Sequence, residues 1–119
     1  MPAAPAMSLG EVQRLFTREV ARLIQQATAM GYELTFGDAY RDPRVFGQQF
    51  QAMGYGRAVS AHKQRLAIDL NLFKDGKYLA DTESHRPLGE WWVSQGPRHC
   101  WGGAFEDGNH YSFDFNGAK

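Results

Sequence analysis

The sequence predicts a single α+β domain with a largely antiparallel sheet and packed helices. The chain has 119 residues, which is the size of one domain. Hydrophobic residues make up 43% of it, enough to build a core and to exclude intrinsic disorder. One long segment near the N-terminus repeats its apolar residues with the period of a helix, whereas later segments alternate with the period of a strand. Turn residues separate those later segments, which favours antiparallel pairing.

The first helix is expected to begin at Ser8 and to end before Gly31. Ser8 stands three residues before Glu11, which is the pattern of a capping box, and Gly31 is suited to the stop position. The apolar residues of one helix face are Val12, Leu15, Phe16, Val20, Leu23, Ile24 and Ala27. Residues 1–7 are rich in Ala and Pro and are expected to form a disordered arm, so the domain proper covers residues 8–119.

Two strands are predicted in the middle of the chain. Residues 32–36 alternate and are rich in β-formers, and residues 37–41 extend the pattern until Pro43 breaks it. The clearest strand spans residues 65–73. Its apolar face carries Leu66, Ile68, Leu70 and Leu72, and its other face carries Ala67, Asp69, Asn71 and Phe73. We expect the first helix to pack on the leucine-rich face.

The remaining elements follow from turn signals and shorter patterns. Asp75 and Gly76 predict a type I′ hairpin turn, after which residues 77–79 return antiparallel. A helix is predicted over residues 86–95, with Pro87 in its first turn and Gly96 after it. One of Trp91 and Trp92 is expected in the core and the other half-exposed, and His85 is expected at the surface just before the helix. Residues 110–115 predict a last strand, and residues 44–59 a short helix followed by a Gly-rich loop.

Charge and composition exclude several classes of function. Lys plus Arg and Asp plus Glu number 13 each, so there is no overall basic field to attract nucleic acid. Apolar runs fall short of the roughly 18 residues that a membrane span needs, so we expect no membrane insertion. The N-terminus lacks the regions of a secretory signal, and we expect a monomer made in the cytoplasm. The single cysteine, Cys100, allows neither an internal disulfide nor a thiolate zinc site.

One acidic residue stands out on the polar face of the clearest strand. Asp69 is flanked there by Ala67 and Asn71, whose small side chains leave room above the carboxylate. His62 precedes it by seven residues, and His110 begins the last predicted strand. Two histidines and an aspartate suit a zinc ion with a fourth position open to water. With four histidines and 13 acidic residues in the chain, a turn cap or an ordinary ion pair stays an open alternative for Asp69.

A second chemical candidate is the adjacent pair His99 and Cys100. Neighbouring residues of an extended segment point apart, so these two side chains are poorly placed to act on each other. We therefore expect Cys100 to be a buried small hydrophobe rather than a nucleophile.

The residues around Asp69 carry a resemblance to a known family. Ser60, His62 and Asp69 match the SxH(x)6D pattern of the M15 peptidases, which include D-alanyl-D-alanine carboxypeptidases and dipeptidases and the phage L-alanyl-D-glutamate endopeptidases. Residues 107–110 (DGNH) resemble the second element of that family, an acid three positions before the last zinc histidine. Residues 101–103 (WGG) resemble the segment that commonly precedes it.

The resemblance extends to an early segment and implies roles for individual residues. Tyr40 and Arg41 resemble the family's [GY]-x-R-[ST] segment, so that four elements cover about residues 32–115 in family order. The implied fold is that of the hedgehog and DD-peptidase type. The implied roles are zinc binding by His62, Asp69 and His110, general base and acid for Asp107, contact with the substrate carbonyl or carboxylate by Arg41, and a place beside the site for Ser60.

The sequence also departs from the family pattern. Arg65 stands where many members have Gly, Ser112 where many have an acid, and Asp42 where Ser or Thr is usual. Glu106 is a rival for the role of base, but adjacent strand residues point to opposite faces, which favours Asp107.

The function that the resemblance implies is a zinc peptidase that cleaves peptidoglycan stem peptides. A minimal chain, no signal and an Asp base favour a phage-type endolysin acting on the L-Ala–D-Glu bond, which reaches the cell wall after release from the cytoplasm. The alternatives are a D-Ala-D-Ala carboxypeptidase or dipeptidase of the same fold, and a non-catalytic module that zinc stabilises.

Overall fold

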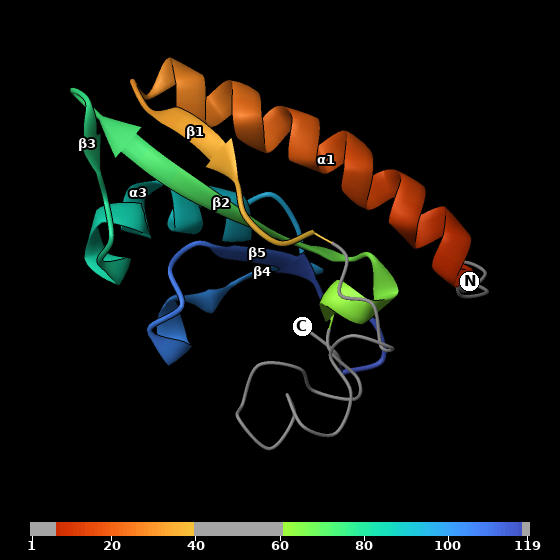
Figure 1. Cartoon of the computed structure of the whole chain (residues 1–119). Helices are drawn as coiled ribbons and strands as arrows, with labels where there is room; N and C mark the ends of the chain where they lie inside the picture. The colour runs from red at the N-terminus through yellow and green to blue at the C-terminus, as the bar shows by residue number, and fades with distance from the viewer. Residues whose placement is uncertain (1–6, 40–60, 118–119) are drawn as a thin grey trace.

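The computed structural model describes residues 7–39 and 61–117 (Figure 1). These residues form two helices and a five-stranded sheet in one compact α+β unit, in which every strand pairing is antiparallel. The strand order is β1-β2-β5-β4, and β3 pairs with β2 beyond that path. The predicted fold class is therefore confirmed at this level. Arg41, Ser60 and the helix and loop expected over residues 44–59 lie outside the described residues, as do residues 1–6 of the expected arm.

Helix α1 (Leu9–Ala29) begins and ends as its sequence predicts. The Ser8 hydroxyl accepts a hydrogen bond from the Glu11 amide, and the Glu11 carboxylate accepts one from the Ser8 amide. Gly31 follows the helix with a φ of +92°, a conformation that glycine adopts without steric cost. The buried side chains of the helix are Val12, Phe16, Leu23 and Ala27. The helix lies along the sheet beside β1 and β2 (Figure 1).

Strand β2 (Ala67–Lys74) is the centre of the sheet, between β1 (Glu33–Phe36) and β5 (His110–Phe113). Leu70 and Leu72 are fully buried, as the alternation predicts. After β1, the backbone of Gly37 and Asp38 still bonds to Asp69, with N···O distances of 2.7 Å in both directions. The predicted extension of the first strand is thus a short continuation of pairing rather than a longer strand.

The hairpin after β2 has the predicted turn. Asp75 and Gly76 have φ values of +53° and +77°, as a type I′ turn requires at both central positions. β3 (Lys77–Tyr78) then returns antiparallel, with Lys74 opposite Lys77.

Helix α3 (Thr82–Val93) starts four residues before the predicted position. Asp81 caps it by accepting a hydrogen bond from the Ser84 amide, and Pro87 lies inside the helix rather than at its start. The prediction took Pro87 as the first turn because proline is common there, and it overlooked Asp81 as a cap. As a consequence His85 is also misplaced: it faces the interior and is 2% exposed.

Both helices cover the same face of the sheet. The ring of Phe16 on α1 contacts Trp92 of α3 and Phe113 of β5 edge-on. Trp92 is fully buried and Trp91 is only partly so, as predicted for this pair. In β4 (His99–Trp101) Cys100 is half-buried rather than enclosed. No helix in the described part of the chain has the length and apolar character to cross a membrane.

Candidate metal centre

Three of the predicted site residues meet on the face of the sheet opposite the core. His62 comes from a single 3-10 turn, η1 (Ala61–Gln64), Asp69 from β2, and His110 from the first position of β5. One nitrogen of each histidine and one oxygen of Asp69 lie within 4.8 Å of one another. This cluster could hold a metal ion, as the sequence predicted.

Strand register explains why two of the three residues meet. Asp69 and His110 are directly opposite each other in the antiparallel pairing of β2 with β5, and opposite residues of such a pair project from the same face. Because successive side chains of a strand point to opposite faces, Asp69 projects from the face opposite that of its neighbour Leu70.

A tight reversal before β2 brings in His62. The Leu66 amide bonds to the Ala61 carbonyl at 2.8 Å, and the Arg65 amide bonds to the His62 carbonyl at 3.2 Å. Arg65 closes the reversal with a φ of +60°, the left-handed region in which glycine is favoured. The reversal points His62 back over the start of the strand, where it is 3% exposed.

Both imidazoles converge on the same carboxylate oxygen. The distance from Asp69 Oδ1 is 3.2 Å to His62 Nε2 and 3.3 Å to His110 Nδ1, and the two rings meet edge-on at 67°. Despite these distances, Oδ1 is buried and accepts no hydrogen bond of acceptable geometry from the described residues. A buried carboxylate oxygen left in this way is costly unless something else satisfies it. A cation among the three atoms would do so.

The hydrogen bond that His62 makes through Nδ1 suits a metal ligand. Its Nδ1 lies 3.1 Å from the carbonyl oxygen of Ala39, and because a carbonyl only accepts, Nδ1 must carry the hydrogen. The other ring nitrogen, Nε2, faces Asp69 and is the atom that would bind a metal ion. Histidines that bind metals are commonly oriented by such a bond from the other ring nitrogen.

Asp69 is ionised throughout the physiological range. Burial alone would raise the pKa of its carboxyl group, but the facing imidazoles of His110 and His62 outweigh burial and lower the pKa to about 2. A carboxylate ligand must be deprotonated to bind a metal, so no proton has to be removed from Asp69 for binding near neutral pH.

Asp107 lies beside the cluster, in the turn between η2 (Gly102–Phe105) and β5. Its Oδ2 is 4.0 Å from His110 Nδ1, and its side chain is 57% exposed. Aspartate at the start of a turn often bonds to backbone amides instead of serving as a base, but no backbone amide among the described residues donates to the Asp107 carboxylate. Glu106 is exposed with a φ of +56° and forms no ion pair with the cluster in that part of the chain.

The segment after β1 is part of the site, although the sequence analysis did not identify it. Gly37 packs so closely on Asp69 that a Cβ atom would lie 3.0 Å from the Asp69 Cβ, and Ala39 orients His62. A glycine at the end of a strand pattern often marks such a close approach. That signal was present between Phe36 and Asp38.

The structure shows the surroundings of two residues, Arg65 and Ser112, at which the sequence departs from the M15 pattern. Arg65 occupies a left-handed position, which explains why glycine would be favoured there and shows that an exposed arginine is accommodated. Ser112 is fully buried two residues after His110, opposite Ala67 and Cys100 in the neighbouring strands. An acid in place of Ser112 would therefore be buried against the sheet.

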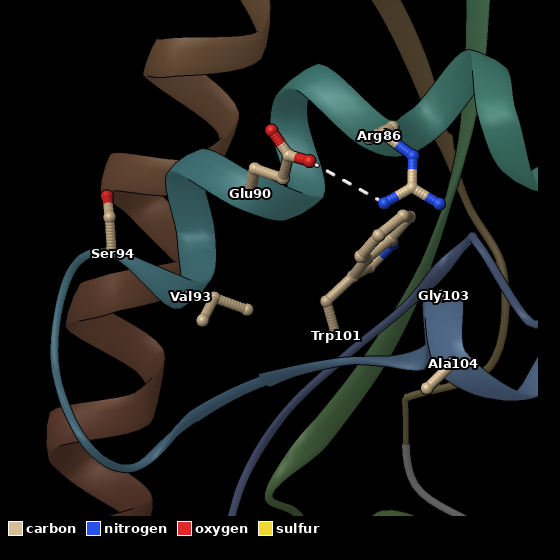
Figure 2. A pocket seen from close by; sticks show the side chains of 7 residues that line it. All are labelled: Arg86, Glu90, Val93, Ser94, Trp101, Gly103 and Ala104. Carbon is tan, nitrogen blue, oxygen red and sulfur yellow. Dashed lines mark ion pairs between the residues drawn. The ribbon is translucent and has the colours of Figure 1, made fainter.

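A separate hollow of about 460 Å³ lies between α3 and the segment after β4 (Figure 2). Arg86, Glu90 and Val93 line one side, and Trp101 and Ala104 line the other. None of the three clustered residues lines it. The Arg86 guanidinium lies over the Trp101 ring and forms an ion pair with Glu90 at 3.5 Å.

Comparison with known proteins adds no assignment, because no family model and no curated protein matches this sequence.

Proposed function

We propose that the chain is a zinc peptidase of the M15 type that cleaves peptidoglycan stem peptides, acting as a phage-type endolysin on the L-Ala–D-Glu bond. The observation that carries the proposal is the convergence of His62 Nε2 and His110 Nδ1 on the unsatisfied Oδ1 of Asp69. The motif resemblance supplies the family, the hedgehog-type fold and the substrate class.

The donor set fits a catalytic ion better than a structural one. Structural zinc sites are closed by four protein ligands, whereas catalytic sites have three and an open position. The described residues offer three ligands and a nearby carboxylate that is mostly exposed. Two histidines and a carboxylate also suit non-haem Fe²⁺, but a partly exposed acid beside the ligands favours hydrolysis, which needs a base.

The chain's own residues then divide the work. His62, Asp69 and His110 would hold the ion, which when bound would supply Lewis acidity to the scissile carbonyl and lower the pKa of bound water. Asp107 takes the proton of the attacking water and passes it to the leaving amine. For Arg41 and Ser60, which lie outside the described residues, the resemblance implies contact with the substrate carbonyl or carboxylate through the N–H donors of Arg41 and a place beside the site for Ser60.

The decisive experiment is mass spectrometry of purified sacculi after digestion by the zinc-loaded protein. An endopeptidase of this type leaves L-Ala on the glycan and releases peptides with an N-terminal D-Glu, and chelation abolishes the products. Loss of one terminal D-Ala instead would assign the carboxypeptidase alternative. Metal-dependent binding to sacculi with no new ends would assign the non-catalytic module.

A further inference from the structure

The indole of Trp101 is packed on several sides near the surface of the molecule. Trp101 ends β4, and its half-buried ring lies beneath Arg86 of α3 and beside the hollow that it helps to line (Figure 2). A Cβ atom on Gly89 or on Gly103 would overlap the indole, so both glycines serve to make room for it. The Arg86 guanidinium covers the ring at 5.3 Å from its centroid, and Glu83 holds Arg86 through two hydrogen bonds of 2.9 and 2.7 Å.

The packing around the indole fixes the direction of the hydrogen bond that its N–H donates. The indole Nε1 donates to the carbonyl oxygen of Gly108 at 2.7 Å. Gly108 directly follows Asp107 and stands two residues before His110. It is buried, and a Cβ atom there would lie 2.7 Å from the Cα of Thr82. Gly108 is therefore held between the Trp101 indole, which binds its carbonyl oxygen, and the N-terminal end of α3, against which it packs.

We propose that Trp101 is a positioning residue for the metal centre: by holding the Gly108 carbonyl, its indole N–H fixes the turn that presents Asp107 and His110 to Asp69. This inference rests on the site proposed above and goes beyond it, because neither the ligand set nor the base includes Trp101. Two backbone bonds shape the turn itself: the Asp107 amide donates to the Gly102 carbonyl at 3.0 Å, and the His110 amide donates to the Asp107 carbonyl at 3.1 Å. Asn109 also joins the turn to β2, because its carbonyl oxygen accepts from the Leu70 amide at 2.9 Å and its side-chain amide donates to Asn71 Oδ1 at 3.3 Å. Neither of these bonds involves Gly108, whose carbonyl oxygen accepts from the Trp101 indole.

The expected consequence is large for a residue that does not touch the ion. Partners that orient metal ligands typically change metal affinity or activity about 10–100-fold when removed. A mostly exposed carboxylate such as Asp107 depends on its backbone for placement, and a shift of about 1 Å in catalytic geometry can cost about 10²-fold in rate.

The test compares Trp101→Phe with Trp91→Phe. Both residues are half-buried tryptophans lying near an arginine guanidinium, and the Arg22 guanidinium is 5.8 Å from the Trp91 ring centroid. Phenylalanine keeps most of the ring packing and removes the N–H. The full-length variants are compared for hydrogen exchange of the Asp107 and His110 amides, for Co²⁺ affinity and visible spectrum, and for kcat and KM on sacculi.

In Trp101→Phe we expect both amides to exchange about tenfold faster, Co²⁺ to bind 10–100-fold more weakly with an altered spectrum, and kcat to fall with KM nearly unchanged. Trp91→Phe should match the wild type in all three. Gly103→Ala, which displaces the ring but keeps the N–H, should resemble Trp101→Phe.

The outcomes separate this inference from the proposed function. If Trp101→Phe matches Trp91→Phe in amide exchange and Co²⁺ binding, the positioning role is wrong, whatever the activity of the wild type. If the wild type binds Co²⁺ but cleaves no sacculi, the proposed function fails while the positioning role is still judged by affinity and spectrum. If the wild type binds no metal, equal amide exchange in the two variants overturns the inference.

Discussion

The two faces of β2 differ in what they contribute, although their residues alternate along eight positions of one strand. On one face Leu70 and Leu72 are fully buried beneath α1 and α3, where each contact is one of many. On the other face Asp69 meets one histidine from the turn before the strand and one from β5, and among the described residues these three form the single cluster that could hold a metal ion. A core tolerates partial loss, whereas a three-ligand site does not.

This difference implies that stability and function should separate by face. Substitutions on the core face should lower the free energy of unfolding. The molecules that remain folded should bind metal and turn over substrate as the wild type does. Substitutions on the site face should abolish metal binding or turnover with a smaller effect on the metal-free fold. The predictions below test that separation, beginning with the largest effect.

The largest expected effect is that of His62→Ala. The variant should lose both the bound metal and all metal-dependent activity, because two ligands cannot hold the ion in place of three. Its melting temperature should no longer rise when zinc is added, since a ligand that binds only the folded state stabilises it. Metal analysis and thermal melts measure both. Lys63→Ala, the next residue of η1, is the control, and full metal content in His62→Ala would refute the assignment.

Asp107→Ala should retain zinc and fold but lose about 10²–10⁴-fold of the turnover, which is what a general acid–base group typically contributes. Glu106→Ala is the matched control, because it removes the adjacent acid, and it should have far less effect. Rates on sacculi are measured with the zinc content of each sample. A nearly normal rate in Asp107→Ala together with an inactive Glu106→Ala would reverse the assignment of the base, and two active variants would end the mechanism.

On the core face, Leu70→Ala should destabilise the protein by roughly 2–5 kcal/mol, because it removes a fully buried side chain and leaves a cavity. Urea unfolding of the metal-free protein measures this without a contribution from the ion. The folded fraction should still bind one equivalent of metal. A loss of metal affinity in folded Leu70→Ala would mean that the two faces are coupled.

Local patterns were sufficient to predict much of the fold. Ser8 and Glu11 cap α1, Asp75 and Gly76 form the hairpin turn, and the alternation around Leu70 gives its burial, since each depends on neighbours in sequence. The predicted start of α3 was wrong because Pro87 was a stronger local signal for a first turn than Asp81 was for an N-cap. The closeness of His62 and Asp69 was proposed from the position of His62 shortly before the strand and from the motif resemblance, not from periodicity.

What the sequence could not supply was tertiary detail. The hydrogen bonds from His62 to the Ala39 carbonyl and from the Trp101 indole to the Gly108 carbonyl depend on how separate segments of the chain pack together. The burial of His85 depends on partners from two other segments: its Nε2 lies 3.0 Å from the Leu79 carbonyl oxygen and its Nδ1 lies 3.4 Å from the Tyr111 hydroxyl. No spacing in the sequence specifies these contacts.

Buried His85 should make the fold sensitive to acid. Burial lowers its pKa, and the hydrogen bond to Leu79 and the charge of Asp81 only partly oppose this. The unfolded chain then binds more protons than the folded one below about pH 6.5, so stability is lost as pH falls, by at most about 1.4 kcal/mol per pH unit. His85→Gln should flatten this slope between pH 7.5 and 5.5 in chelator. Parallel slopes in the two proteins would contradict the assignment.

The smallest effect is expected for Asn71→Ala, the neighbour of Leu70 on the opposite face. The Asn71 amide donates to the Thr35 hydroxyl and accepts from the Asn109 amide, both at 3.3 Å. These bonds are long and partly open to solvent, so water replaces them when the side chain is removed, and a typical hydrogen bond contributes only about 0.5–1.5 kcal/mol. We therefore expect about 1 kcal/mol or less in urea unfolding of the metal-free protein.

The pair Leu70→Ala and Asn71→Ala is the sharpest comparison of the two faces, because it changes adjacent residues of one strand. Asn71 also touches the turn of Asp107 and His110, but only through the side chain of Asn109, whereas Trp101 holds the backbone of that turn directly. Metal affinity in Asn71→Ala should therefore remain within about threefold of wild type, well inside the 10–100-fold expected for a partner that orients ligands. If Asn71→Ala instead lowers stability as much as Leu70→Ala, the polar face is itself a packed core. A metal affinity as weak as that of Trp101→Phe would move the positioning role from the indole to the asparagine pair.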